Sequence, residues 1–154
     1  MISIKQILVP CDFSEGSEVA LKYARELARA FAAKLHLIHV LEEPLFYAAG
    51  PDFVPPTTGF YENLERHLDD RLHSLLSPEE TQQYQTQFAT PRGSPFVEII
   101  QYAKSQGIDL IVMGTHGRGP IAHMLMGSVT EKVVRKAPCP VLTVRHPQHE
   151  FVMP

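Results

Sequence analysis

Three glycines and a serine in the last third of the chain have the types and spacing of an anion-binding loop. They begin directly after the apolar run Ile108–Met113 and are Gly114, Gly117, Gly127 and Ser128. Glycine allows a sharp turn and a close approach of the backbone to a ligand, while the unpaired N–H groups and the dipole of a helix start favour an anion. A buried strand, a glycine turn and a helix start in this order predict a phosphate cradle, although glycine loops also serve as plain turns.

Two better-known phosphate cradles do not match this segment. Gly114 and Gly119 have the spacing of the two P-loop glycines, but Pro120-Ile121 stands where a P-loop has Lys-Ser/Thr. A dinucleotide-binding G-x-G-x-x-G motif belongs after the first strand of its domain, and the first predicted strand here runs into Pro10-Cys11-Asp12. The cradle is therefore of another kind.

The histidines and the one arginine near these motifs allow fewer conclusions. His116 and Arg118 lie inside the glycine segment, where they either reach phosphate oxygens or stay solvated. His36 and His39 are three residues apart on a predicted strand, so their side chains point to opposite faces of the sheet. We therefore predict no metal-binding residues.

The elements that position these residues alternate along the chain. Strands are predicted at Ile2–Pro10, Lys34–Leu41, Gln83–Thr90 (weak, at a sheet edge), Ile108–Met113 and Cys139–Val144. A first helix is predicted from a Ser14 cap to Phe31, and a second over Tyr61–Leu76, which Ser77-Pro78 would end. A third is predicted over Phe96–Gln106, with Ser94-Pro95 as its start and Gly107 as its cap. The last is predicted over Ser128–Lys136. The stretch Phe46–Gly59 is predicted to be an irregular loop. Strands that alternate with helices predict an α/β domain with a parallel sheet.

Two of these helices have apolar stripes that are expected to face the core. The stripe of the first helix consists of Val19, Ala20, Tyr23, Ala24, Leu27, Ala28 and Phe31. The stripe of the second consists of Leu64, Leu68, Leu72 and Leu75.

Composition and charge are those of one ordinary globular domain. The chain has 154 residues, 44% of them hydrophobic and 20% charged, with a formal net charge of −3. This acidic balance argues against a nucleic-acid partner, and no apolar run reaches the roughly 18 residues that a membrane helix needs. Cys11 and Cys139 are expected to be buried thiols that behave as small hydrophobes. We therefore expect a cytoplasmic protein with no membrane and no nucleic-acid partner.

The glycine segment and three further motifs resemble the universal stress protein family, whose ATP-binding members carry G-x2-G-x9-G-S/T. The run 7–12 (ILVPCD) is similar to the family's first-strand V-P-x-D signature. The run 127–134 (GSVTEKVV) resembles its final helix, and 137–144 (APCPVLTV) resembles its approach to the last strand. The likeness covers nearly the whole chain and is weakest between Leu45 and Gly93.

This resemblance implies a fold, a ligand and a set of site residues. The fold would be an open five-stranded parallel sheet of order 3-2-1-4-5 with helices on both faces, formed by residues 1–146 as one domain, with a frayed tail at 147–154. ATP or another adenine nucleotide would bind at the switch point between strands one and four. The implied nucleotide-binding residues are Pro10, Asp12, Val40, Met113, Gly114, Gly117, Gly127, Ser128, Val129 and Thr130.

The resemblance also implies a role for each part of that set. Asp12 would lie against adenine and ribose, the backbone of Val40 would pair with the adenine edge, and Met113 and Gly114 would lie beneath the ribose. Gly117, Gly127, Ser128 and Val129 would hold the phosphates through backbone N–H groups, and Thr130 would assist by its hydroxyl.

The function implied is that of a nucleotide-binding stress-response protein that switches a conformation or a partner, with an unknown downstream protein. Mg²⁺ would enter with the phosphates. We predict no catalytic residues, because no residue of the cradle is a convincing general base and no Walker-type lysine exists. The alternatives are a slow ATPase or nucleotide-dependent transferase, and a dimeric interaction module with an empty pocket. A homodimer is expected through the last strand, because Pro140–Val144 is apolar yet lies at the sheet edge.

Overall fold

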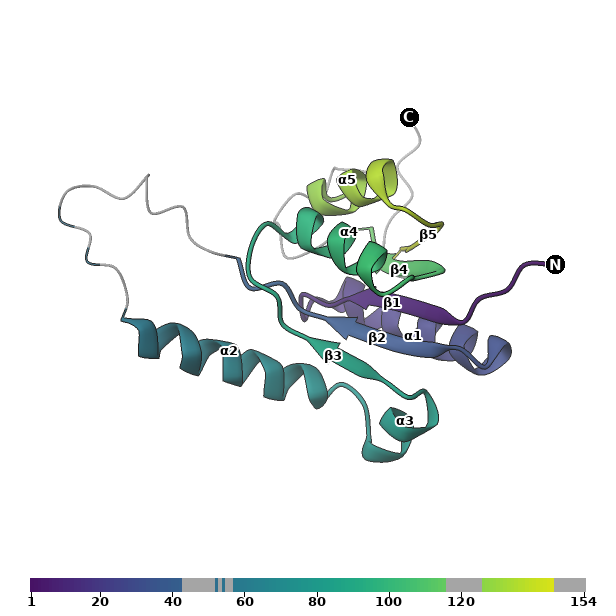
Figure 1. Cartoon of the computed structure of the whole chain (residues 1–154), viewed down its shortest axis with the longest axis horizontal. Helices are drawn as coiled ribbons and strands as arrows, with labels where there is room; N and C mark the ends of the chain where they lie inside the picture. The colour runs from purple at the N-terminus through teal and green to yellow at the C-terminus, as the bar shows by residue number, and fades with distance from the viewer. Residues whose placement is uncertain (43–51, 53, 55–56, 116–125, 146–154) are drawn as a thin grey trace.

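Five short strands form one parallel sheet, and their order is β3-β2-β1-β4-β5 (Figure 1). The structure is a computed structural model that describes residues 1–42, 52, 54, 57–115 and 126–145. The strands are β1 (Gln6–Pro10), β2 (Lys34–Ile38), β3 (Gln87–Ala89), β4 (Leu110–Gly114) and β5 (Val141–Val144). The predicted α/β class, the open parallel sheet and the order 3-2-1-4-5 are confirmed.

Strand β1 lies at the centre of the sheet, with β2 on one side and β4 on the other. Its residue Leu8 is paired with His36 of β2 and with Ile111 of β4. After β1 the chain adds β2 and β3 on one side of it and then crosses to add β4 and β5 on the other side, so the strand order reverses between β1 and β4. Open α/β sheets bind ligands at the carboxyl end of the strands where such a reversal occurs.

Helices cover both faces of the sheet (Figure 1). Helix α1 (Glu15–Phe31) packs on one face, where α2 (Thr58–His73) and α3 (Pro78–Gln83) lie beside it, and α4 (Pro95–Ser105) and α5 (Ser128–Lys136) pack on the other. Alternate residues of β1 enter the two cores: Ile7 and Val9 face α1, and Leu8 faces α4 and α5. Within the described ranges, no helix is both long and apolar enough to cross a membrane.

Two predicted strands are longer than the strands observed. The predicted first strand began at Ile2, but Ile2 is 81% exposed and β1 begins at Gln6, where pairing with Lys34 starts. Strand β2 ends at Ile38 rather than at Leu41, which forms only an isolated bridge with Arg92. In both cases the apolar pattern extends beyond the regular ladder: Ile2 lies outside the sheet, while His39 and Leu41 keep single backbone bonds to Ala89 and Pro91.

The Ser77-Pro78 pair begins a helix instead of ending one. Helix α2 ends at His73, and Ser77 caps α3 by a capping box. The Ser77 hydroxyl accepts the N–H of Glu80 at 3.1 Å, and the Glu80 carboxylate accepts the N–H of Ser77 at 3.0 Å. A capping serine followed by proline is a helix-start signal. The Ser94-Pro95 pair also stands at the start of α4, although the Ser94 side chain makes no capping hydrogen bond there.

The weak strand and the loop around these helices also have different bounds. Strand β3 covers only Gln87–Ala89, and it is the edge strand that the sequence predicts. Nine of the fourteen residues of the loop predicted over Phe46–Gly59, and the whole tail predicted from Pro147, lie outside the described residues. Helix α2 begins at Thr58, three residues before its predicted start.

Helix α1 begins as predicted but presents a different face to the sheet. The Ser14 hydroxyl accepts the N–H of Ser17 and caps the helix. Tyr23 and Phe31 are 54% and 44% exposed, while Leu21, which lay outside the predicted stripe, is buried. The buried face is centred on small residues, which let the helix axis approach the sheet closely and leave the large side chains at the rim. These small residues are Ser17, Ala20, Ala24 and Ala28.

Beneath α4, the one histidine that is fully buried in the described part of the chain is held by two side chains. His36 Nε2 lies 3.0 Å from the Gln6 amide oxygen, and His36 Nδ1 lies 3.0 Å from the Tyr102 hydroxyl. The Gln6 amide nitrogen donates to Gln106 O at 2.9 Å, so its oxygen faces the ring. Nε2 therefore carries the proton, and Nδ1 accepts from Tyr102. His39 contacts Cys11 and Phe13 on the opposite face, as the strand period predicts.

The buried His36 gives a testable pH dependence. Burial, assisted by the charge of Lys34, lowers the pKa of His36 below its ordinary value of 6.5. Below pH 6.5 the unfolded chain therefore takes up a proton that the folded chain does not, and the free energy of unfolding falls, with a limiting slope of about 1.4 kcal/mol per pH unit for this group. Urea unfolding at a series of pH values is expected to show a smaller acid loss in His36→Gln. Parallel pH curves for the two proteins would contradict this assignment.

Candidate functional site

The start of α5 leaves three backbone N–H groups without a partner inside the helix. The first helical hydrogen bond runs from Glu131 N to Gly127 O at 3.0 Å, so the N–H groups of Ser128, Val129 and Thr130 precede it. The N-cap residue is Gly127, which has no side chain that could accept from them. A helix start with an uncapped first turn favours an anion, because its N–H groups and dipole are both directed outward.

The two ends of the glycine segment meet at the end of β4. Gly127 N–H donates to Thr115 O at 2.5 Å, and Thr115 N–H donates to Val144 O at 3.0 Å. The N–H of Gly127 is thus already bonded, and Ser128 and Val129 are the implied phosphate residues whose N–H groups have no partner among the described residues. The implied contact at Gly117, with the neighbouring His116 and Arg118, lies outside the described residues.

Three of the implied residues have structural contacts of their own. The Thr130 hydroxyl, which is buried, donates to Gly114 O at 2.9 Å and so joins α5 to β4. That proton is directed at Gly114 and not toward a phosphate. The Met113 side chain is buried in the core beneath α4 and α5, and its backbone lies within the ladder that β4 forms with β5.

Gly114 is required by packing against α1. A Cβ atom on Gly114 would lie 2.8 Å from both the C and O atoms of Gly16, in the first turn of α1. The sequence suggested that this glycine clears space for a ligand. In the structure it clears space for the backbone of another element.

The Asp12 carboxylate, at the end of β1, also serves the start of α1. Its Oδ1 accepts the N–H of Ser14 at 3.0 Å and the hydroxyl of Ser14. Pro10 ends β1, and the buried Cys11 follows it. Burial, assisted by the neighbouring Asp12, raises the pKa of the Cys11 thiol to about 12, so this thiol stays protonated and packs as a small hydrophobe.

The backbone of Val40 faces the space beyond the end of β1. His39 N–H donates to Ala89 O at 3.1 Å and Leu41 N–H donates to Pro91 O at 2.8 Å, so both neighbours of Val40 turn toward β3. Successive backbone groups of an extended chain point to opposite sides. The N–H and C=O of Val40 therefore point toward β1, one step past the bond from Cys11 N to Ile38 O.

The fold brings these implied residues to one edge of the sheet. Asp12 contacts Ser14 at the start of α1, and Gly114 contacts Gly16 two residues further along, in the first turn of the same helix. Gly114 in turn accepts the hydroxyl of Thr130 in the first turn of α5. The ends of β1 and β4 and the start of α5 are thus connected through direct contacts.

Sequence reasoning missed a cluster of three side chains beside Asp12. The centroids of the Phe13 and His39 rings are 4.7 Å apart. The guanidinium carbon of Arg71 lies 4.2 Å from the centroid of the Phe13 ring. Phe13 has a φ of 62°, a conformation that costs a bulky residue about 1–3 kcal/mol and persists only where the surroundings hold it. These residues are far apart in the sequence, so no motif could have predicted the cluster.

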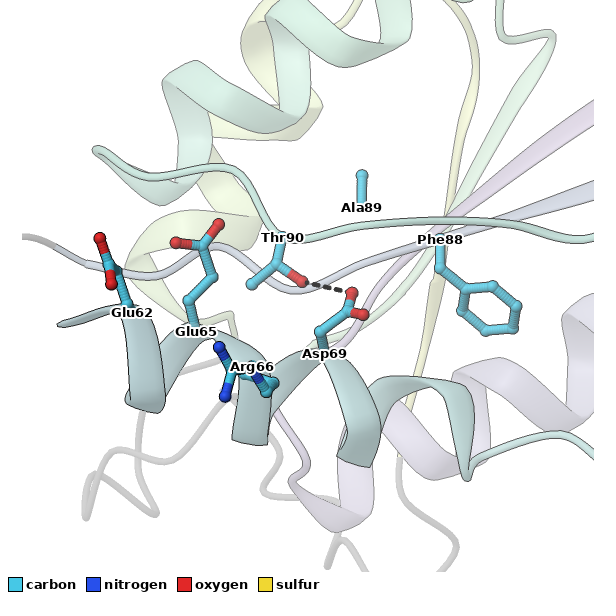
Figure 2. A pocket seen from close by; sticks show the side chains of 7 residues that line it. All are labelled: Glu62, Glu65, Arg66, Asp69, Phe88, Ala89 and Thr90. Carbon is cyan, nitrogen blue, oxygen red and sulfur yellow. Dashed lines mark hydrogen bonds between the residues drawn. The ribbon is translucent and has the colours of Figure 1, made fainter. Parts of the chain in front are cut away.

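A cavity of about 460 Å³ lies elsewhere, between α2 and β3 (Figure 2). Its lining residues are Glu62, Glu65, Arg66, Asp69, Phe88, Ala89 and Thr90, none of which belongs to the implied nucleotide set. The Thr90 hydroxyl points across it and donates to Asp69 at 3.1 Å. Three carboxylates against one guanidinium make this lining unsuited to a phosphate.

Comparison with known proteins identifies the family. The model of the universal stress protein family matches residues 3–145. The chain belongs to this family. The resemblance seen in the sequence motifs is confirmed, and residues 3–145 include every residue of the implied nucleotide set.

Similar universal stress proteins come from distant organisms. Universal stress protein MJ0577 of Methanocaldococcus jannaschii is 30% identical over 159 residues, covering 94% of this chain and 96% of the relative. A universal stress protein of Thermus aquaticus is 33% identical over 141 residues, covering 92% of this chain and 98% of the relative. The solved structure of MJ0577 has 29% identity and a TM-score of 0.74, with 96% of this chain and 99% of that chain covered.

Proposed function

We propose that this universal stress protein binds an adenine nucleotide at the carboxyl ends of β1 and β4 and acts by switching a conformation or a partner. The observation that carries the proposal is the uncapped start of α5, held beside Gly114 at the point where the strand order reverses. The phosphates would accept from the N–H groups of Ser128 and Val129, with Gly117 as a further implied contact. Mg²⁺ would bind through the phosphates.

The nucleoside end of the proposed site is formed by β1 and β2. The backbone N–H and C=O of Val40 offer one donor and one acceptor for the adenine edge, and Asp12 offers its carboxylate to adenine and ribose. One solved structure is a universal stress protein in complex with cAMP, with 24% identity and a TM-score of 0.58. That protein has the same fold and holds an adenine nucleotide, which agrees with the ligand class proposed here.

Asp12 provides a test of the nucleoside end. Asp12→Ala is expected to weaken adenosine and ATP by a similar factor of about ten or more, because a hydrogen bond to a charged group contributes about 1.5–3 kcal/mol. Calorimetry with both ligands measures this. Asp12→Asn keeps an oxygen that can accept from Ser14, so it separates the loss of charge from any loosening of the start of α1. A loss confined to ATP would contradict the placement.

Beside the nucleotide site, we propose that two copies of the chain pair through β5. Within the described residues β5 pairs with β4 alone, so its outer side is a sheet edge, and Leu142 is 38% exposed there. Ile111 N donates to Pro140 O and Thr115 N donates to Val144 O, so alternate residues of the strand turn inward. Val141 and Thr143 therefore direct their backbone groups to the outer edge, where an antiparallel copy would pair with them.

Proline substitution at the outer edge tests this dimer. Val141→Pro removes a donor on the outer side and is expected to convert a dimer at micromolar concentration into a folded monomer, as measured by sedimentation. Leu142→Pro is the matched control, because it removes a donor that faces β4 and is expected to lower the free energy of unfolding. An unmutated protein that sediments as a monomer would exclude the dimer, and a folded Val141→Pro dimer would place the interface elsewhere.

A further inference from the structure

The cluster of Phe13, His39 and Arg71 joins three parts of the fold beside the proposed nucleoside site. Phe13 lies in the turn between β1 and α1, His39 follows β2, and Arg71 belongs to the last turn of α2. The rings of Phe13 and His39 are 4.7 Å apart, and the guanidinium of Arg71 lies over the Phe13 ring at 4.2 Å. Such a cation above an aromatic ring is attracted by the negative face of the ring.

This cluster holds the residues on both sides of Asp12. His39 Nδ1 lies 2.7 Å from Cys11 O, which fixes the residue before Asp12. Phe13, the residue after it, has a φ of 62°, which L residues rarely adopt. The contacts of the Phe13 ring therefore help to keep the turn in a conformation that it would otherwise leave. This turn also sets the position of the Asp12 carboxylate.

Among the described residues, helix α2 buries its leucine side chains most deeply near its carboxyl end. Leu72 is fully buried, whereas Leu64 and Leu68 are half-buried. Further upstream, α2 is held to the segment after β3 by polar contacts, from Thr90 to Asp69 and from Arg92 to Glu65. Glu65 and Asp69, which make these contacts, also line the open cavity (Figure 2), and α2 runs along the β3 edge of the sheet (Figure 1). Arg71 lies in the last turn of α2, next to the fully buried Leu72.

We propose that Arg71 is a positioning residue for the nucleoside end of the site. Docked on Phe13, it holds the turn that presents Asp12, and it thereby links the docking of α2 to the affinity for adenosine. The proposal rests on the proposed function, because it takes Asp12 as the nucleoside contact. Since coupling between two sites is reciprocal, bound adenosine would also hold α2 more firmly against the sheet.

Adenosine affinity tests the coupling. Arg71→Ala is expected to weaken adenosine binding by about two- to five-fold, the factor that corresponds to an exposed cation–π contact. Arg71→Lys keeps a cation over the ring and is expected to bind within about two-fold of the unmutated protein. Arg66→Ala is the control, since Arg66 lies on the same helix but lines the cavity. Equal affinity of Arg71→Ala and Arg66→Ala would overturn the proposal.

A second measurement needs no ligand and separates this proposal from the proposed function. The N–H of Ser14 is bonded to Asp12, so its hydrogen exchange reports on the turn directly. We expect Arg71→Ala to speed this exchange about two- to five-fold without ligand, and Arg71→Lys and Arg66→Ala to leave it unchanged. Unchanged exchange in Arg71→Ala overturns the positioning role. Faster exchange in a protein that binds no adenosine would keep the positioning role and reject the proposed function.

Discussion

Gly127→Val is expected to abolish ATP binding while the protein stays folded. A valine side chain at the N-cap of α5 would stand where a phosphate must approach the N–H groups of Ser128 and Val129. Two hydrogen bonds to a charged group contribute about 3–6 kcal/mol together, so the affinity should fall by a factor of at least about one hundred. Calorimetric titration with ATP measures the loss.

The backbone at Gly127 is the reason that the fold should survive. Gly127 has φ −65° and ψ 153°, a conformation that valine adopts readily, and its N–H can keep the bond to Thr115. Gly59→Val is a matched control, because a Cβ atom at Gly59 in α2 would meet nothing within 4 Å. If Gly127→Val binds ATP as tightly as Gly59→Val does, the start of α5 is not the phosphate site.

Gly114→Ala is expected to lower the free energy of unfolding by about 1–3 kcal/mol, the usual penalty for adding a methyl group to a close-packed interior. The new Cβ would lie 2.8 Å from the backbone of Gly16. A backbone cannot rotate aside as a long side chain can, so β4 and α1 would have to separate. Urea unfolding measures the change, and for a domain of this size the midpoint of thermal unfolding should fall by about 2–4 °C per kcal/mol.

Gly59→Ala serves as the control for this substitution as well. Its methyl group would point into open space, and alanine is the better helix former, so the stability of this variant should be unchanged or slightly higher. Equal unfolding midpoints for Gly114→Ala and Gly59→Ala would show that α1 gives way at little cost. That outcome would contradict the packing role of Gly114.

Local patterns in the sequence were sufficient to predict the class and order of most elements. The apolar runs of β1 and β4 are buried on both faces, the Ser14 and Ser94 caps begin α1 and α4, and Gly107 ends α4 with a φ of 61°. Each of these features depends on residues that are close together in the chain. The family resemblance added the strand order, which local patterns do not contain.

The same local reasoning was wrong where a signal had two meanings. Ser77-Pro78 was interpreted as the end of a helix, although a capping serine before proline starts one, and α3 begins there. The stripe on α1 included Tyr23 and Phe31, which are exposed, because periodicity alone does not tell how far a helix is rotated against a sheet. That rotation is decided by the close approach that Ala20 and Ala24 permit.

By itself, then, the sequence determined an alternating α/β chain and the glycine spacing before α5, because both depend on neighbours along the chain. Only the tertiary structure decided that Gly114 makes room for Gly16, that the Thr130 hydroxyl is directed at Gly114, and that Arg71 lies over Phe13. Each of these contacts joins elements that the strand order brings together. A contact between distant segments depends on that order and on the rotation of each helix, and neither is written in the spacing of residues along one element.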